Sequence, residues 1–203
     1  MPKSLYIDTS LAILAGGRST RIGYDKTKLT RDGIVIAAHI YYQLVDYFND
    51  IFLVTKCDMK FPDFPGRVIC DQWEENASMI GIAESLRNAI NPWVFIMSAD
   101  IVFFKYELLK DICLTQREDK NVIVPRINGN YEPLFGLYNK RILSKVINAV
   151  KTKSFKIYEH FSDWGCKTID IDVEDTRSLI FNVNTPDDIN YAVNNGWIDP
   201  PAY

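Results

Sequence analysis

The sequence has few cysteines and no long apolar run, and each shortage excludes a class of protein. Its four cysteines, Cys57, Cys70, Cys113 and Cys166, form no C-x-x-C pair and have spacings that fit no zinc site. We expect all four to be unpaired, which favours a reducing compartment. Cys57 and Cys70 lie at or just after apolar strand-like runs, where we expect them to act as small hydrophobic side chains. No stretch approaches the ~20 apolar residues that span a bilayer, and the N-terminus lacks the apolar core of a signal peptide. The sequence therefore predicts a cytoplasmic protein without a membrane segment.

A basic surplus is also missing. The 203 residues carry a formal net charge of -3, whereas proteins that bind nucleic acids usually have an excess of Lys and Arg. We therefore do not expect a nucleic acid as partner. The hydrophobic fraction of 47% supplies enough apolar side chains for a sizeable core. Because no repeat or Pro/Gly-rich linker divides the chain, we expect one domain that covers residues 1–203.

Short apolar runs alternate with amphipathic stretches along the chain. Strands are expected at 11–14, 51–54, 68–70, 93–97, 122–124, 167–171 and 180–183. Helices are expected at about 34–48, 79–90, 106–115 and 141–150. A last helix should begin at Thr185-Pro186, with Thr185 as N-cap, and end near Gly196. This alternation predicts βαβ units and an α/β fold in which helices cover both faces of a mostly parallel sheet.

The segment from Leu11 to Leu29, LAILAGGRSTRIGYDKTKL, carries the strongest functional signal. An apolar strand runs directly into Ala15-Gly16-Gly17, and Arg21 and Lys26 follow in a polar loop. Small residues let a ligand approach the backbone, whose N–H groups can bind an anion, and the basic side chains can neutralise a triphosphate. The loop is neither a Walker A motif nor a dinucleotide fingerprint. Because it follows the first strand, we favour a phosphate site over a plain Gly-Gly turn.

The motif L-A-G-G-x-S-x-R-x-G-x-D-K-x-x-L in this segment resembles the signature of the molybdenum cofactor guanylyltransferases. The similarity continues in the same order along nearly the whole chain. It implies a Rossmann-like three-layer αβα fold with a mostly parallel, mixed central sheet, of the nucleotide-diphosphosugar transferase type. It also implies that Arg21 and Lys26 are catalytic and that the nucleotide is bound by Leu14, Ala15, Gly16, Gly17, Arg21 and Lys26.

A second similarity involves the acidic residue that closes the strand at 67–70. This residue is Asp71, and the helix start that reads G-P-L-x-G in the family is Ala77-Ser78-Met79-Ile80-Gly81 here, so that Gly81 matches. The resemblance implies that Asp71 and Gly81 bind the nucleotide. A carboxylate suits this task because it accepts two N–H bonds from a guanine edge. The alternative for Asp71 is a turn or a helix cap.

Two further motifs supply candidate metal ligands. The C-D-x-P motif of the family reads Ser98-Ala99-Asp100-Ile101, which implies that Asp100 is catalytic and binds both the nucleotide and Mg2+. The alternative is an Asp that caps the next helix. The N-x-N-T-P motif is present as 182–186. Because residues two apart on a strand share a face, we expect Asn182 and Asn184 both to reach the active site. The resemblance implies a role near the metal, the nucleotide or the acceptor, and we take both as candidate metal ligands.

A softer similarity covers Glu132 to Tyr138, which matches a P-L-x-x-L-Y strand of the family. The proline in this strand indicates a sheet edge or a bulge beside a site. We regard Arg126 and Glu132 as exposed candidates for the acceptor side.

Together these residues predict transfer of a nucleoside monophosphate to a phosphorylated acceptor, with release of pyrophosphate. The resemblance implies GTP as nucleotide, molybdopterin as acceptor, Mg2+ as cofactor and maturation proteins of molybdoenzymes as further partners. One alternative is a cytidylyl- or sugar-phosphate nucleotidyltransferase on the same fold. A second is a non-catalytic nucleotide-binding protein, which the altered segments 77–81 and 98–104 would suit. A third is an α/β scaffold without a small-molecule site.

Overall fold

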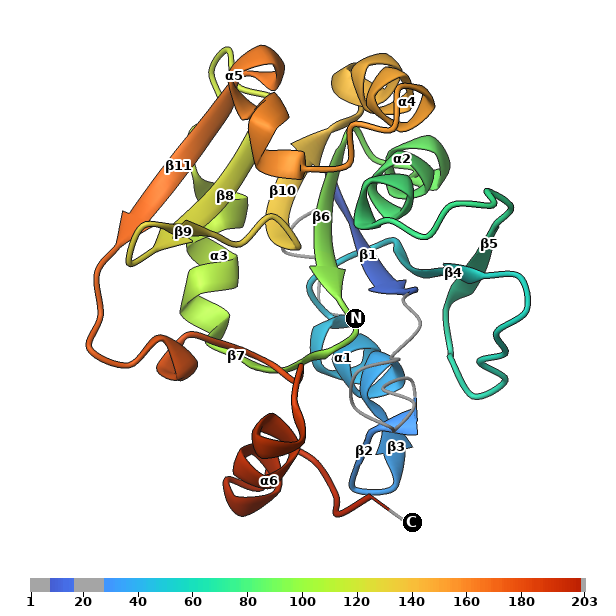
Figure 1. Ribbon diagram of the computed structural model, residues 1–203, viewed down its shortest axis with the longest axis vertical. Helices are drawn as coiled ribbons and strands as arrows, with labels where there is room; N and C mark the ends of the chain where they lie inside the picture. Colours follow the sequence, from blue (N-terminus) through green and yellow to red (C-terminus); the bar gives the residue numbers. More distant parts are fainter. Residues whose placement is uncertain (1–7, 17–27, 202–203) are drawn as a thin grey trace.

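The computed structural model describes residues 8–16 and 28–201, which form a three-layer αβα fold (Figure 1). Eight described strands make one mixed sheet, in which β9 (Asn130–Tyr131) pairs with β8. The order of the others is β11 (Cys166–Ile171), β8 (Val122–Ile127), β10 (Phe135–Asn139), β6 (Trp93–Ser98), β1 (Thr9–Ala15), β4 (Ile51–Lys56) and β5 (Arg67–Asp71). The predicted fold class is therefore confirmed.

The directions of the strands decide which residues meet at one edge of the sheet. β1 pairs in parallel with both β4 and β6, and β4 pairs in parallel with β5. β10 is antiparallel to β6 and β8, whereas β11 is parallel to β8. The ends of β5, β4, β1, β6, β8 and β11 thus share an edge with the beginning of β10, and we call this the carboxyl edge. Ligand sites of open α/β sheets lie at this edge, where the strand order reverses.

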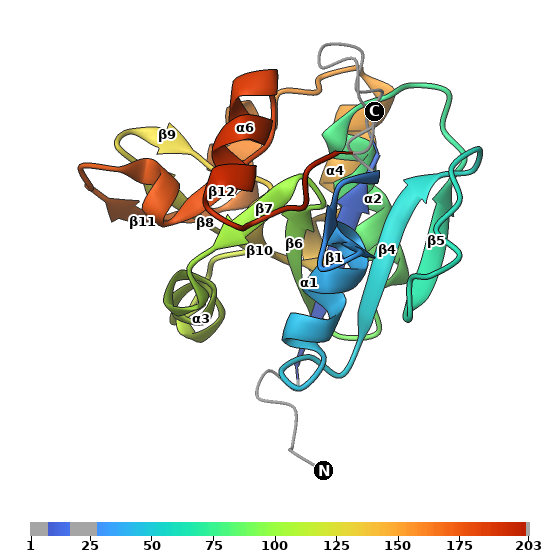
Figure 2. The same ribbon diagram turned by 90° about the horizontal axis from the view of Figure 1, so that it is seen from below.

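Helices cover both faces of the sheet (Figure 2). On one face lie α1 (Ile36–Leu44) and α3 (Tyr106–Leu114), and on the other α2 (Ser78–Asn88) and α4 (Leu143–Lys151). All seven residues of β1 are buried, because Leu11 and Ile13 face one layer of helices while Ala12 and Leu14 face the other. No helix in the described ranges combines the length and apolarity that a membrane span requires.

Short elements complete the fold. Two-stranded ladders join β2 (Thr30–Arg31) to β3 (Ile34–Val35) and β7 (Ile101–Phe104) to β12 (Ile180–Asn182). The helix predicted at 34–48 begins later, at Ile36, because Ile34 and Val35 pair in this first hairpin, and it also ends earlier, at Leu44. Around the second half lie α5 (Phe161–Trp164) and 3-10 turns at Lys140–Ile142, Ile157–His160 and Thr176–Ser178.

The last helix, α6 (Pro186–Asn194), begins where the sequence predicts it. The Thr185 hydroxyl accepts a hydrogen bond from the Asp188 amide at 3.1 Å, and the Asp188 carboxylate accepts one from the Thr185 amide at 2.8 Å. This capping box satisfies the first free N–H groups of the helix. Two residues beyond its end, Gly196 takes a left-handed φ of 68°. The predicted start and end of this helix are confirmed.

The expectation of four unpaired cysteines is wrong. Cys57 and Cys70 form a disulfide between the ends of the neighbouring strands β4 and β5, where their Cα atoms lie 4.9 Å apart. Both side chains are exposed, so neither acts as a core residue, and an oxidised pair gives no support for a reducing compartment. Cys113 and Cys166 are free. Burial raises the pKa of both thiols, that of Cys166 to about 12, which agrees with a role as small hydrophobic side chains.

Candidate active site

A cavity of about 140 Å³ opens at the carboxyl edge between β1, β4, β5, β6 and the start of α2. Five of the residues predicted to bind the nucleotide line it: Leu14, Gly16, Asp71, Gly81 and Asp100. They come from distant parts of the chain, and the parallel strands bring them together because β1 lies between β6 and β4. The cavity occupies the position at which doubly wound sheets bind ligands.

The end of β1 forms one wall of the cavity. Leu14 lines it, whereas Ala15 is buried and its carbonyl accepts a hydrogen bond from the Thr55 hydroxyl at 2.9 Å. Gly16 is exposed, and a Cβ added there would meet no atom of the described residues within 4 Å. Gly17, Arg21 and Lys26 lie outside the described residues, so their predicted contacts with the triphosphate stay predictions.

The opposite wall depends on a buried ion pair. The Asp71 carboxylate, 8% exposed, lies 2.8 Å from Lys56 Nζ and also accepts the Trp73 amide at 2.8 Å. Lys56 Nζ further donates to the carbonyl oxygens of Trp73 and Glu75, at 2.7 and 2.6 Å. The pair thereby holds the loop that leads into α2. Both oxygens of Asp71 already have a partner within this wall, Lys56 Nζ and the Trp73 amide. The predicted contact of Asp71 with a guanine edge stays a prediction.

Lys56 lines the cavity but was not among the predicted site residues. It is the last residue of β4, whose sequence is IFLVTK, just as Asp71 is the last residue of β5 and Gly16 follows the last residue of β1. All three therefore lie at the carboxyl edge. That position at the end of a buried strand is the signal in the sequence that could have identified it.

Gly81 allows α2 to approach the end of β1. A Cβ added at Gly81 would lie 2.9 Å from Cδ1 of Leu14, closer than carbon atoms normally pack. Both residues line the cavity. The glycine therefore shapes the cavity by letting the Leu14 side chain occupy this space.

Asp100 lies in the turn between β6 and β7. The preceding Ala99 amide donates to the Leu14 carbonyl at 2.9 Å, and the Asp100 carbonyl accepts the Val183 amide at 3.0 Å. This turn is therefore tied to the end of β1 on one side and to the end of β12 on the other. The turn thereby places the end of β1, which is predicted to bind the nucleotide, close to the 182–186 motif.

The two asparagines of that motif differ in their surroundings. Asn182 pairs with Ile101 across β12 and β7, and its Oδ1 is buried without a hydrogen-bond partner among the described residues. β12 ends at Asn182, so strand alternation does not place Asn184 on the same face, contrary to our argument from the sequence. The Asn184 amide instead donates to the Asp188 carboxylate at 2.9 Å, beside the cap of α6.

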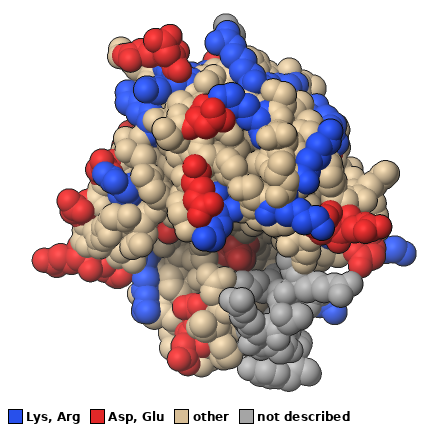
Figure 3. All heavy atoms as spheres, turned by 45° about the horizontal axis from the view of Figure 1, so that its top comes forward, with Lys and Arg blue, Asp and Glu red and all other residues tan. Residues whose placement is uncertain are grey.

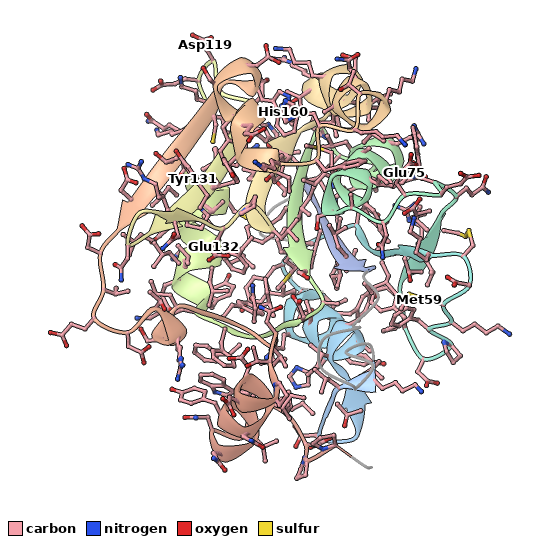
Figure 4. All side chains as sticks on the ribbon, in the orientation of Figure 1. Met59, Glu75, Asp119, Tyr131, Glu132 and His160 are labelled. Atoms are coloured by element: carbon pink, nitrogen blue, oxygen red, sulfur yellow. A yellow bond between two sulfur atoms is a disulfide. The ribbon has the colours of Figure 1, made fainter. Side chains whose placement is uncertain are left out.

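The start of β10 lies on the other side of Asp100. The Leu134 carbonyl accepts the Ser98 amide at 3.1 Å, and Leu134 lines the cavity. Glu132 is half-buried rather than exposed as expected, and burial, followed by the negative charge of Asp100, raises the pKa of its carboxyl. Figure 4 shows Glu132 and Glu75 on opposite sides of β6 and β1.

Arg126, at the end of β8, lies farther out along the carboxyl edge. Its guanidinium donates two hydrogen bonds to the Asp170 carboxylate, at 2.5 and 3.0 Å, and lies 5.7 Å from the centre of the Tyr131 ring. These hydrogen bonds raise the pKa of Arg126 and lower that of Asp170. On the face drawn in Figure 3, Lys and Arg are interspersed with Asp and Glu.

Comparison with known proteins relates this site to one family. A model of the MobA-like NTP transferase domain matches residues 11–161, which include the ends of β1, β5 and β6. The chain belongs to the MobA-like NTP transferase family. A probable molybdenum cofactor guanylyltransferase from Natranaerobius thermophilus is 30% identical to it over 196 residues, which cover 91% of this chain and 95% of that relative.

Two solved structures share the fold of this chain. A crystal structure of an Aquifex aeolicus protein has a TM-score of 0.73 and 27% identity, over 88% of this chain and 94% of that one. Molybdopterin-guanine dinucleotide biosynthesis protein A from Archaeoglobus fulgidus has a TM-score of 0.73 and 22% identity, over 92% and 97%. The MobA-like chain is therefore a nucleotidyltransferase, as the resemblance predicted, and not a scaffold without a small-molecule site.

Proposed function

We propose that this nucleotidyltransferase moves GMP from GTP to the phosphate of molybdopterin, forming molybdopterin guanine dinucleotide and pyrophosphate. The observation that carries the proposal is the cavity that gathers Gly16, Asp71, Gly81 and Asp100 at the carboxyl edge. The relative from Natranaerobius thermophilus, which matches this chain over nearly its whole length, supports guanine and molybdopterin as substrates. Activity in the cytoplasm and contact with maturation proteins of molybdoenzymes belong to the same proposal.

The residues of the chain act mainly by position and charge. The base and ribose would lie in the cavity between Leu14, Gly81 and the wall held by Lys56. The bound triphosphate would extend past Gly16, where we expect Arg21 and Lys26 to contact it. An oxygen of the acceptor phosphate forms a bond to the α-phosphorus as the bond to the pyrophosphate oxygen breaks. A phosphate is already ionised at neutral pH, so this attack requires no general base.

Mg2+ is the cofactor of the proposed reaction, and the residues beside Asp100 fit it. Asp100 supplies a carboxylate, and the buried Asn182 Oδ1 is an acceptor without a hydrogen-bond partner in the described chain. Oxygen atoms of these two kinds are the ligands that Mg2+ takes. Asp100 and Asn182 would hold the ion, with Asn184 as a further candidate. When bound, Mg2+ neutralises negative charge on the phosphates.

The test is pyrophosphate release by the purified protein with Mg2+, molybdopterin and either GTP, CTP, ATP or UTP, with the product identified by its mass. We expect release with GTP and a product of molybdopterin plus GMP. Preferential turnover or thermal stabilisation by CTP would reject guanylyl transfer in favour of the cytidylyl alternative. Turnover with a sugar phosphate alone would support the sugar-nucleotide alternative, and the absence of release with every pair would indicate a non-catalytic protein.

A further inference from the structure

Glu132 differs from the buried carboxylates of the described chain. Each of those has a cationic partner within 2.8 Å: Asp50 with Arg67, Asp71 with Lys56 and Glu84 with Arg87. No described side chain donates a hydrogen bond to the carboxylate of the half-buried Glu132 or forms an ion pair with it. After burial, the negative charge of Asp100 is the second cause that raises the pKa of this carboxyl. A carboxylate in this setting loses hydration without receiving a donor, which disfavours the folded state.

The backbone holds Glu132 firmly in this position. Its amide donates to the Pro125 carbonyl at 3.1 Å, its carbonyl accepts the Phe135 amide at 3.1 Å, and Pro133 follows it in the turn. The next contact along the chain, from the Ser98 amide to Leu134, joins the turn to the end of β6. The fold therefore keeps the backbone of Glu132 near the end of β6, which leads into the Asp100 turn, although the Glu132 carboxylate gains no partner among the described residues.

Oxygen acceptors come from three neighbouring segments here. Glu132 contributes a carboxylate and Asn182 a buried amide oxygen that has no donor in the described chain. The Asp100 turn is joined to the residue after Asn182 by the bond from the Val183 amide to the Asp100 carbonyl, and β6, which precedes the turn, is joined to the Glu132 segment by the bond from the Ser98 amide to the Leu134 carbonyl. Two carboxylates that repel each other and an unpaired amide oxygen are complementary to a cation. Asp100 lines the cavity, whereas Glu132 and Asn182 do not. Of these two, Asn182 precedes Val183, whose amide donates to the Asp100 carbonyl, so we place Glu132 farther than Asn182 from the position of a direct ligand.

We infer that Glu132 is a positioning residue of the cation site: it accepts a hydrogen bond from a water bound to the divalent ion that Asp100 and Asn182 hold. The inference rests on the metal site of the proposed function and adds a residue to it. Mg2+ and Mn2+ keep several of their waters in such sites, and carboxylates that bind these waters orient them. Removal of such a partner typically lowers metal affinity by about 10- to 100-fold.

The experiment measures Mn2+ binding by the electron paramagnetic resonance signal of free Mn2+, with and without GTP. We compare the wild type with Glu132→Gln, which keeps the shape and removes the charge, and with Glu174→Gln, an exposed residue of the loop after β11. Glu132→Gln should weaken Mn2+ binding by about 10-fold or more and raise the Mg2+ concentration needed for half-maximal pyrophosphate release. Glu132→Asp, which retains the charge, should recover part of the affinity, and Glu174→Gln should equal the wild type.

Equal Mn2+ affinity of Glu132→Gln and the wild type would overturn the inference, as would a wild type that binds no Mn2+ in either condition. The melting temperature of metal-free Glu132→Gln should equal or exceed that of the wild type, because the variant removes an unpaired charge. A wild type that binds Mn2+ through Glu132 but releases no pyrophosphate with GTP and molybdopterin would reject the proposed function alone. The two failures are therefore distinguishable.

Discussion

The two sides of the site differ in how far their polar groups satisfy one another. On the β5 side, Lys56 Nζ contacts three oxygen acceptors and Asp71 receives two donors. On the β10 side, Glu132 has no described partner and Asn182 Oδ1 is buried without one. The β5 side is therefore a wall whose polar groups are paired within the fold, whereas we propose that the β10 side obtains its partners from a ligand or an ion.

The ion pairs of the two sides also differ in how far their side chains are exposed to solvent. The side chains of Lys56 and Asp71 are 19% and 8% exposed, while those of Arg126 and Asp170 are 39% and 57% exposed. Breaking a buried pair leaves a charge without water or partner, whereas water replaces the partner of an exposed charge. The buried pair should thus contribute more to stability than the exposed pair, although its contact is the longer of the two, at 2.8 Å against 2.5 Å.

The largest effect is expected at Asp100, which lies between the two sides. Asp100→Ala should lower pyrophosphate release about 10²- to 10³-fold, the typical cost of removing one group that stabilises charge in the transition state. The melting temperature should change little, because the backbone bonds of the turn to Leu14 and Val183 remain. A variant with near-normal turnover would remove Asp100 from the mechanism.

The contrast between the ion pairs is tested by Lys56→Met and Arg126→Met. Lys56→Met leaves the Asp71 carboxylate buried and unpaired, so we expect a loss of about 3–5 kcal/mol in the free energy of unfolding. Arg126→Met should cost much less, because water replaces the partner of the exposed Asp170 carboxylate. Urea unfolding of both variants gives the comparison, and similar losses would contradict the distinction between the two sides.

Reduction of the Cys57–Cys70 disulfide should affect the β5 side selectively. The bridge closes a loop with a sequence separation of 13, and a loop of this size stabilises a fold by about 3 kcal/mol. We expect a dithiol reductant to lower the melting temperature and to weaken GTP binding more than Mn2+ binding. The Cys57→Ser/Cys70→Ser double variant is the control: it should resemble the reduced protein and should not respond to the reductant.

The smallest effect is expected at Gly81. Gly81→Ala should change stability by less than about 1 kcal/mol, because the atom that the new Cβ meets is the flexible end of Leu14. The displaced Leu14 side chain should narrow the cavity and weaken GTP binding several-fold. A Cβ at Gly16 meets no atom of the described residues within 4 Å, so we expect Gly16→Ala to weaken GTP binding through contact with the ligand. Titration of both variants with GTP, and of Gly81→Ala combined with Leu14→Ala, would show whether Leu14 transmits the effect.

The sequence by itself determined the features that depend on neighbouring residues. The apolar runs that become β1, β4 and β6, and the Thr185 cap of α6, follow from periodicity and from local hydrogen bonds. The motif at Gly16, Gly81 and Asp100 was recognisable from residue types at strand ends and from its family resemblance. Strand ends meet at one edge in any parallel sheet, so these residues could be assigned to one cavity before their geometry was known.

Only the tertiary structure decided which strands are neighbours, and therefore which side chains become partners. β4 beside β5 joins Cys57 to Cys70 and Lys56 to Asp71, although nothing in their spacing indicates a pair. The antiparallel direction of β10 brings Glu132 next to Asp100 and buries half of a side chain that we expected to be exposed. Burial and pairing depend on contacts between strands that are far apart in the sequence. A local pattern of residues does not determine these contacts.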